Sequence, residues 1–177
     1  KEIIGQENIA SEIASKNQIK SRKLIGFKVK PQKDYLHSRS VLLLNQDIQI
    51  SLAAPMESMK EYFYKNALAD ELIFIHKGTG ILKTFLGDIH FVEGDYIVIP
   101  KGVVYQFEFY STKNKMLIIE SAGPITAPKR YKNKEGQFLE TSPYCERDLK
   151  MPQDLKTIDE EGNFKMKIKK GDIIHTL

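Results

Sequence analysis

The stretch Glu93-Gly94-Asp95-Tyr96-Ile97-Val98-Ile99-Pro100-Lys101-Gly102 decides the fold class of this chain. Gly94 provides the positive φ that a tight turn needs, and Asp95 can hydrogen-bond to the turn backbone. The four residues that follow have the composition of a strand. Pro100 ends that strand because proline has no N–H to donate, and Gly102 lets the chain reverse. The stretch therefore predicts a turn, a short strand and a second turn.

Similar short strands surround this one, and glycine-containing turns separate several of them. The predicted strands are Val41–Leu44, Ile48–Leu52, Glu71–His76, Ile81–Phe85, Ile89–Val92, Tyr96–Ile99, Val103–Tyr110, Met116–Ser121 and Phe164–Lys170. Strands at this spacing are typical of an antiparallel sandwich or barrel. Tyr105, Phe107 and Phe109 alternate along one strand, so their rings are expected to share one face and fill the interior. The opposite face of that strand carries Val104, Gln106 and Glu108.

Residues 71–80 and 93–102 together resemble the two halves of the cupin signature. In the first half, Glu71 opens a strand that ends in a glycine turn. The two halves at this spacing predict an all-β, cupin-type antiparallel jelly roll over residues 41–121. Residues 1–40 are expected to form an N-terminal arm, in which Asn8–Lys16 could be a short amphipathic helix. A helical turn or two is expected over Glu57–Lys65.

Residues 122–177 are expected to form an irregular extension, which prolines punctuate. We expect it to pack on the barrel or on a C-terminal half that this sequence lacks. Its apolar residues outside the late strand need a surface to cover them; they are Phe138, Leu139, Tyr144 and Leu149. Apolar area is therefore expected to be exposed here, with self-association or a disordered tail as its consequence.

A metal-binding cupin places two histidines just before the signature glutamate, and a third three residues after the Pro-x-Gly glycine. The upstream positions of this chain are Tyr64, Lys65, Asn66 and Ala67, and the downstream position is Tyr105. Three of the four ligands of a divalent-metal site are therefore missing. We predict no catalytic, cofactor-binding or metal-binding residue in this chain. Glu71 is either the remnant of a lost metal site or the acceptor of a structural hydrogen bond, and the second interpretation is favoured.

The histidines, the single cysteine and a lysine cluster are the other candidate sites in the sequence. The histidines are His37, His76, His90 and His175. Because they share no ligand spacing, they are interpreted as surface residues or as supporting residues outside a metal site. Cys145 has no activating base nearby in sequence, so an unreactive thiol is expected. The lysines at 165, 167, 169 and 170 alternate along a predicted strand, which favours a solvated face over a nucleic-acid patch.

Composition excludes several classes of protein. The 177 residues suffice for one sizeable domain, and no apolar run approaches the roughly 20 residues that span a bilayer. The first residues lack the apolar core of a signal peptide. One cysteine excludes an intrachain disulfide and suits the cytoplasm. A net charge of +4, from 27 Lys+Arg and 23 Asp+Glu, gives no basis for a nucleic-acid partner.

Several segments resemble homogentisate 1,2-dioxygenases of bacteria and eukaryotes. These segments are residues 63–66, 70–72, 87–88, 130–133, 136–140 and 143–149. The run Pro143-Tyr144-Cys145-Glu146-Arg147-Asp148-Leu149 is the most specific, because nothing in a jelly roll requires it. Within the family it is expected to be a docking loop with paired charges, Glu146 and Arg147 among them.

The resemblance implies a parent enzyme that opens the homogentisate ring with O2 in tyrosine and phenylalanine catabolism. Non-haem iron(II), held by two histidines and a glutamate, is the implied cofactor. Because those ligands lie in the family's C-terminal half, none is carried over to a residue here. The chain is expected to be an N-terminal structural piece, inactive alone, that supports the catalytic half and contributes to a homo-oligomer. The alternatives are a stand-alone, metal-free cupin that binds a small ligand and a metal-dependent cupin such as an isomerase; the missing histidines argue against the latter.

Overall fold

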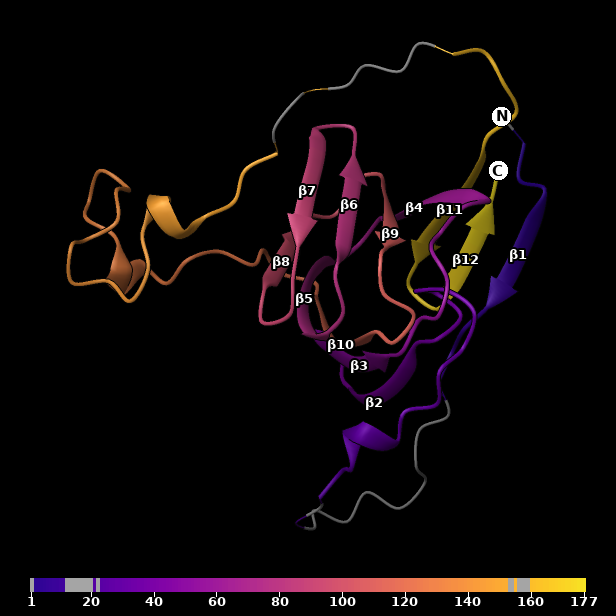
Figure 1. Cartoon of the computed structure of the whole chain (residues 1–177), viewed down its shortest axis with the longest axis horizontal. Helices are drawn as coiled ribbons and strands as arrows, with labels where there is room; N and C mark the ends of the chain where they lie inside the picture. Colours follow the sequence, from indigo (N-terminus) through magenta and orange to yellow (C-terminus); the bar gives the residue numbers. More distant parts are fainter. Residues whose placement is uncertain (1, 12–20, 22, 153–154, 156–159) are drawn as a thin grey trace.

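The computed structural model describes residues 2–11, 21, 23–152, 155 and 160–177 of the chain. Within these described residues, twelve strands form two sheets that enclose one core (Figure 1). The seven-stranded sheet has the order β1-β12-β11-β4-β9-β6-β7, and the five-stranded sheet has the order β2-β3-β10-β5-β8. The strands are β1 Gly5–Asn8, β2 Ser40–Leu44, β3 Ile48–Ala53, β4 Tyr62–Asn66, β5 Asp70–Lys77, β6 Gly80–Thr84, β7 Gly87–Phe91, β8 Tyr96–Ile99, β9 Tyr105–Phe109, β10 Lys115–Ser121, β11 Lys165–Lys170 and β12 Ile173–Thr176.

The stretch that decides the fold adopts the predicted geometry. Gly94 has a φ of 93° and Gly102 a φ of 85°. The carboxylate of Asp95 accepts a hydrogen bond from the Val92 N–H at 2.8 Å, which closes the turn before β8. That strand ends at Ile99, directly before the proline. The chain is therefore all-β, and its two sheets form a jelly roll of the cupin type.

The interior is filled by alternate residues of the strands, as the period of two requires. Tyr105 and Phe107 on β9 are 1% and 0% exposed, and Phe109 packs half-buried against the same core. At Gly80 the neighbouring backbone comes so close that an added Cβ would lie 2.1 Å from the Glu108 carbonyl oxygen. A glycine at this point allows β6 and β9 to pair closely.

Three sequence-based expectations about elements need correction. The helical turn expected over Glu57–Lys65 is wrong, because Tyr62–Asn66 is strand β4. The sheets are not wholly antiparallel, because β4 and β11 pair in parallel, with Lys169 opposite Asn66. The strands β1 and β12 were not predicted; they pair with each other, and β12 also pairs with β11. The helix expected at Asn8–Lys16 lies largely outside the described residues, and Asn8 itself belongs to β1.

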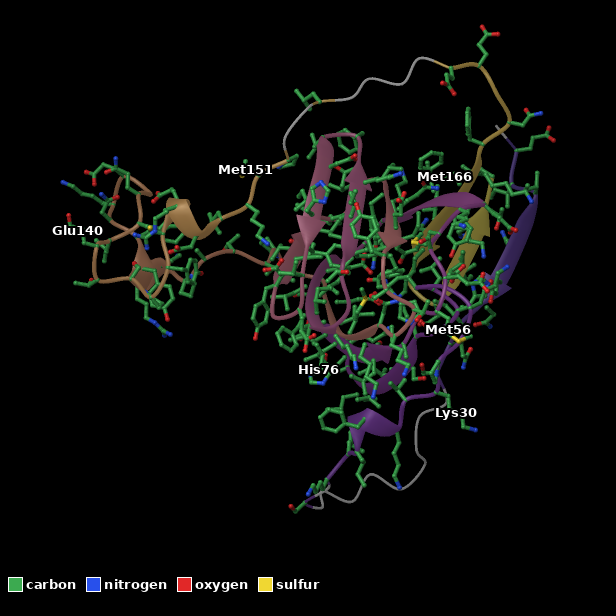
Figure 2. The ribbon with its side chains drawn as sticks, viewed as in Figure 1. Lys30, Met56, His76, Glu140, Met151 and Met166 are labelled. Carbon is green, nitrogen blue, oxygen red and sulfur yellow. The ribbon has the colours of Figure 1, made fainter. Side chains whose placement is uncertain are left out.

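Residues 124–150 extend away from the two sheets and fold back on themselves (Figure 1). Glu140 lies far from the barrel in Figure 2. The Tyr144 ring lies 5.8 Å from that of Tyr131 and 5.4 Å from that of Phe138, so the segment has a small aromatic cluster of its own. Leu139 and Leu149 remain exposed. An ion pair of 2.6 Å between Lys150 and Asp95 connects the end of the segment to the barrel.

Among the described residues, no helix is long and apolar enough to cross a membrane.

Candidate functional site

The four positions at which a metal-binding cupin has its ligands do converge inside the barrel. Tyr64 and Asn66 lie on β4, Glu71 on β5 and Tyr105 on β9, and all four side chains are buried. The rings of Tyr64 and Tyr105 meet edge to face, with their centroids 5.3 Å apart. The Tyr105 hydroxyl donates a hydrogen bond of 2.5 Å to Glu71. The prediction that Glu71 accepts a structural hydrogen bond is therefore confirmed.

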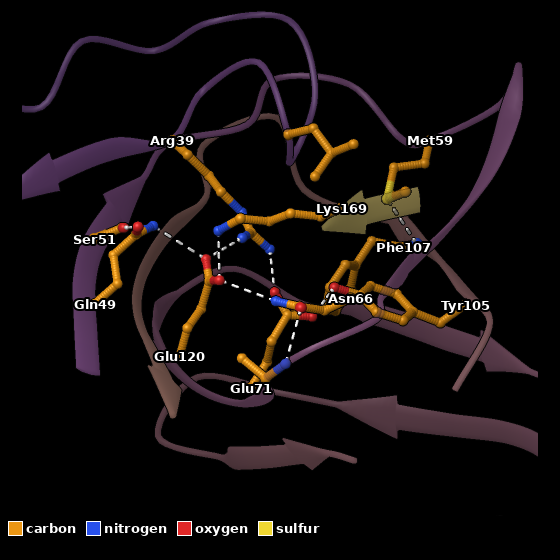
Figure 3. A network of polar contacts seen from close by, with 12 residues as sticks. Arg39, Gln49, Ser51, Met59, Asn66, Glu71, Tyr105, Phe107, Glu120 and Lys169 are labelled. Carbon is orange, nitrogen blue, oxygen red and sulfur yellow. Dashed lines mark hydrogen bonds and ion pairs between the residues drawn. The ribbon is translucent and has the colours of Figure 1, made fainter. Parts of the chain in front are cut away.

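A guanidinium group occupies the centre of this arrangement (Figure 3). Arg39 comes from the segment before β2, and its two terminal nitrogens donate to Glu71 at 2.6 Å and to Glu120 at 2.7 Å. The guanidinium carbon lies 4.3 Å from the centre of the Tyr35 ring and 5.6 Å from that of Tyr64. Two carboxylates and two aromatic faces thus surround one cation.

Lys169 is the second cation of this network. Its ammonium group contacts Glu120, and the carboxylate of Glu120 also accepts hydrogen bonds from Asn66 at 2.9 Å and Gln49 at 3.2 Å (Figure 3). The expectation of a solvated lysine face on this strand is wrong at Lys169, which is only 5% exposed. The two carboxylates of the network are balanced by two cations. We call the set Arg39, Glu71, Glu120 and Lys169 the buried charge network.

The buried charge network joins the two sheets. Both carboxylates belong to the five-stranded sheet, on β5 and β10. Their partners Lys169, Asn66 and Tyr105 belong to the seven-stranded sheet. Opposite charges inside a protein stabilise it only when the pairing is complete, because each bare ion has a large desolvation cost. The arrangement therefore fixes how one sheet sits on the other.

The electrostatics of the network favour fixed charges. Burial is the largest influence on Tyr105 and Tyr64 and raises the pKa of both hydroxyls, which remain protonated at neutral pH. Burial alone would raise the pKa of Glu120, but the charges of Arg39 and Lys169 outweigh it and lower that pKa. The pKa of Arg39 is raised, because the surrounding tyrosines and glutamates outweigh the effect of burial. Arg39 and the two tyrosines therefore keep their protons near pH 7 while Glu120 stays ionised, which makes all four poorly suited to general acid–base work.

These residues do not fit the iron that the enzyme family implies. Tyr64, Asn66 and Tyr105 replace the histidines, and the carboxylate of Glu71 is already engaged by Arg39 and Tyr105. A divalent ion placed between these groups would face the positive charge of Arg39. In the part of the chain that the structure describes, no cluster of three or more His, Cys, Asp or Glu side chains could hold a metal ion.

Two hollows lie outside this network. One, of about 380 Å³, lies between residues 24–32 and the strands β2 and β3. The other, of about 390 Å³, has Met59, Phe107 and Phe109 among its lining residues, with Lys83 and Glu108 beside them. Neither is lined by Arg39, Glu71 or Glu120. Any small ligand in them would therefore not contact the buried charges.

The remaining candidate residues do not converge on the network or on one another. His76 and His90 are exposed and His175 is half-buried. His37 lies 2.6 Å from Asp34, which is a local partner that sequence reasoning missed. Cys145 is half-buried in the projecting segment. Within that segment Arg147 is paired, as expected, and its partner is Asp148.

The fold and the cation-centred interior define the class of protein: a cupin-type jelly roll whose usual ligand positions hold a salt-bridge network. The family described as "Homogentisate 1,2-dioxygenase N-terminal" matches residues 35–130. The chain belongs to this family.

A curated relative and several solved structures are similar to the chain. A protein of Saccharolobus solfataricus, named "Putative dioxygenase", is 39% identical over 152 residues, which are 86% of this chain. The chain spans only 39% of the length of that relative. A cupin-2 domain protein of Shewanella frigidimarina is 24% identical, with a TM-score of 0.45 over 54% of this chain and 87% of that one. A cupin superfamily protein of Desulfitobacterium hafniense is 20% identical, with a TM-score of 0.47 over 60% and 95%.

Proposed function

We propose that this chain is the non-catalytic N-terminal domain of a homogentisate 1,2-dioxygenase, a cytoplasmic enzyme that opens the ring of homogentisate with O2. The iron and its ligands are supplied by a part of the enzyme outside this sequence. The domain supports that catalytic part and shapes the oligomer. Membership of an N-terminal dioxygenase family and the greater length of the relative support this proposal.

The single observation that carries the proposal is the position of Arg39. Its guanidinium is hydrogen-bonded to Glu71, the carboxylate that a metal-binding cupin would use as a ligand. A cation on a protein side chain thereby takes the structural role of a metal, because it organises the same group of inward-facing residues. The chain keeps the cupin architecture, but among its described residues the usual ligand positions offer no open coordination position for substrate and O2, which an iron oxygenase needs.

The test measures iron and oxygen on the purified 177-residue chain. The chain is incubated anaerobically with iron(II), desalted, and analysed for bound metal; oxygen uptake is then recorded with homogentisate. We expect no stoichiometric iron and no turnover above that of free iron(II). A full-length homogentisate dioxygenase, treated in the same way, is the positive control. About one tightly bound iron per chain, or sustained ring cleavage by the chain alone, contradicts the proposal.

The hollow beside Met59 and Phe109 favours a second candidate, a stand-alone module that binds a small molecule. Its volume of about 390 Å³ is within the usual range for ligand sites, and it combines aromatic lining with charged groups. Thermal unfolding with and without homogentisate or related aromatic acids separates the two functions. A saturable rise in the unfolding temperature that Phe109→Ala removes, and Tyr110→Ala does not, would favour the binding module.

A further inference from the structure

The outer face of the five-stranded sheet is apolar across all its strands. Paired residues form two rows that run from strand to strand. The first row is Leu43, Ile50, Ile119, Leu72 and Val98, and the second is Leu52, Leu117, Phe74 and Tyr96, with the polar Ser40 next to Leu52 at the β2 end. The nine apolar members of the two rows alternate with the inward-facing side chains of the core, so they point away from it. We call them the outer apolar face.

The other sheet shows what a solvent-facing surface of this fold looks like. On the outer side of β6, β9 and β7, one row is Lys83, Gln106 and Asp88. The next row is Ile81, Glu108 and His90. An antiparallel sheet with one face in water normally has polar residues there. The seven-stranded sheet follows this rule at all of these positions except Ile81, whereas the two rows of the five-stranded sheet are apolar everywhere except at Ser40.

Much of the outer apolar face is open to solvent in this chain. Tyr96 is 68% exposed, Leu43 57% and Val98 46%. Five strands at about 4.8 Å spacing and about 20 Å length give a flat area on the order of 500 Å². The whole face, part of which is covered by residues 26–28, is thus of the size at which a contiguous apolar patch marks an interaction site.

The N-terminal arm already uses one side of this face. The 3-10 turn η1, Gly26–Lys28, lies beside β2 on the side away from the seven-stranded sheet (Figure 1). A Cβ at Gly26 would lie 2.9 Å from the Leu52 side chain, and the Phe27 ring packs 5.2 Å from the His76 ring. Lys115 donates to the Phe27 carbonyl at 3.1 Å. The arm thus covers the β3 side but leaves Tyr96 and Val98 on β8 open.

We propose that the outer apolar face is the surface on which the catalytic part of the dioxygenase docks, through an apolar sheet face of its own. This inference rests on the function proposed above. A flat surface without charges fits another sheet, because two such faces pack about 10 Å apart with interdigitating side chains. A charged partner surface would bury polar groups that find no hydrogen-bond partner here.

The size of the face favours a partner on the same polypeptide over a second copy of this chain. A standard stable complex buries about 800 Å² on each partner, which is more than this face offers. A covalent connection raises the effective concentration of the partner, so a smaller interface suffices. The Saccharolobus solfataricus relative contains such additional chain, since the matched part is 39% of its length.

The test compares the accessibility of a single thiol on each outer face. In a Cys145→Ser background, Val98→Cys on the edge strand β8 reports on the outer apolar face. The matched control is His90→Cys on the edge strand β7, which lies on the polar outer face of the other sheet. Each variant is prepared as the 177-residue chain and as a fusion in which this chain replaces the matching segment of the Saccharolobus solfataricus protein. The rate of labelling by a maleimide is followed by mass spectrometry.

We expect the fusion to slow the labelling of Val98→Cys by on the order of tenfold or more, and that of His90→Cys little. Equal rates for Val98→Cys in the chain and the fusion overturn the proposal. Protection of Val98→Cys in the 177-residue chain that fades on dilution also overturns it, because a second copy would then be the occupant.

A measurement on the chain alone keeps the inference testable if the fusion does not fold. The 177-residue chain should enhance the fluorescence of an apolar dye, and Val98→Lys should reduce that enhancement several-fold while His90→Lys, on the polar outer face of the other sheet, leaves it unchanged. A folded chain without dye binding overturns the proposal. Failure of the proposed function is distinguishable from these outcomes, because it appears as iron binding or oxygen uptake by the chain alone.

Discussion

The interior of the barrel has two halves that are stabilised by different means. One half is the buried charge network, in which Arg39, Glu71, Glu120 and Lys169 neutralise one another. The other is aromatic: the rings of Phe91, Phe107 and Phe109 lie with their centroids 5.6 to 6.1 Å apart. Tyr35 connects the two, because it packs on Phe107 at 4.7 Å and under the Arg39 guanidinium.

The two halves differ in how they depend on the rest of the chain. The aromatic rings come from β7 and β9. Burial of their apolar area stabilises the fold, and this contribution does not require one particular neighbour for each ring. The charged half needs one residue from the arm, two from the five-stranded sheet and one from the late strand β11. Apolar packing tolerates small changes, whereas a buried charge that loses its partner has no substitute. The charged half therefore makes the arrangement specific, and the aromatic half provides most of the apolar burial.

Removal of Arg39 should have the largest effect. Arg39→Ala leaves the carboxylates of Glu71 and Glu120 buried and short of a counter-charge, so we expect a loss of about 3–5 kcal/mol in the free energy of unfolding. Urea unfolding followed by circular dichroism measures it. Arg147→Ala, which removes a largely exposed guanidinium, is the control and should be close to neutral. Equal stability of Arg39→Ala and wild type would show that the network is not formed.

Glu120→Gln should cost about 3 kcal/mol at pH 7, and this cost should shrink in acid. The pKa of Glu120 is lowered in the folded state, so its charge stabilises the fold above the ordinary value of 4.5 and ceases to do so as the pH falls through the lowered value. Stability of wild type and variant is measured by urea unfolding from pH 7 to pH 3. The two curves should converge toward the acid end; a constant gap would contradict the lowered pKa.

Phe107→Leu tests the aromatic half and should cost about 2 kcal/mol, through lost burial and ring contacts. Because no ionisable group is removed, this loss should be nearly the same at pH 7 and pH 4, in contrast to Glu120→Gln. Tyr110→Leu, at an exposed position, serves as the control. A strong pH dependence for Phe107→Leu would mean that the two halves are coupled more tightly than their contacts indicate.

Tyr105→Phe should have the smallest effect of the four, about 1–2 kcal/mol. It keeps the ring in the core and removes only the hydroxyl that donates to Glu71, which still has Arg39. Combination with Arg39→Ala in a double-mutant cycle measures the coupling. A loss in the double variant equal to the sum of the two single losses would show that the two donors act on Glu71 independently.

The aromatic half could be predicted from the sequence and the charged half could not. The alternation of Tyr105, Phe107 and Phe109 with polar residues is local, and period two alone places the rings inside. The missed strand β4 had the same signal, because Tyr62, Tyr64 and Asn66 face inward and Phe63 and Lys65 do not. The spacing of Met56, Met59, Tyr62 and Phe63 gave a competing helical pattern there.

The inward position of Lys169 has no local signal. It follows from the parallel pairing with β4 and from the presence of Glu120 on the other sheet, neither of which a pattern along the chain can reveal. The outer apolar face did have a signal: residues 72–75, 96–99 and 116–119 are continuous apolar runs, typical of strands that are covered on both faces. The proline-rich composition after Ala122 is a stronger local signal and predicts the exposed apolar area there instead.

The parallel pairing of β4 with β11 has a consequence for the order of events during synthesis. Glu120 and Lys169 are 49 residues apart, so at about 5–20 residues per second the carboxylate leaves the ribosome roughly 2–10 s before its lysine partner. During that interval strand β4 lacks its parallel neighbour β11, and the interior lacks the positive charge of Lys169. The nascent chain must therefore stay soluble as an incomplete barrel until strands β11 and β12 have been translated and have paired.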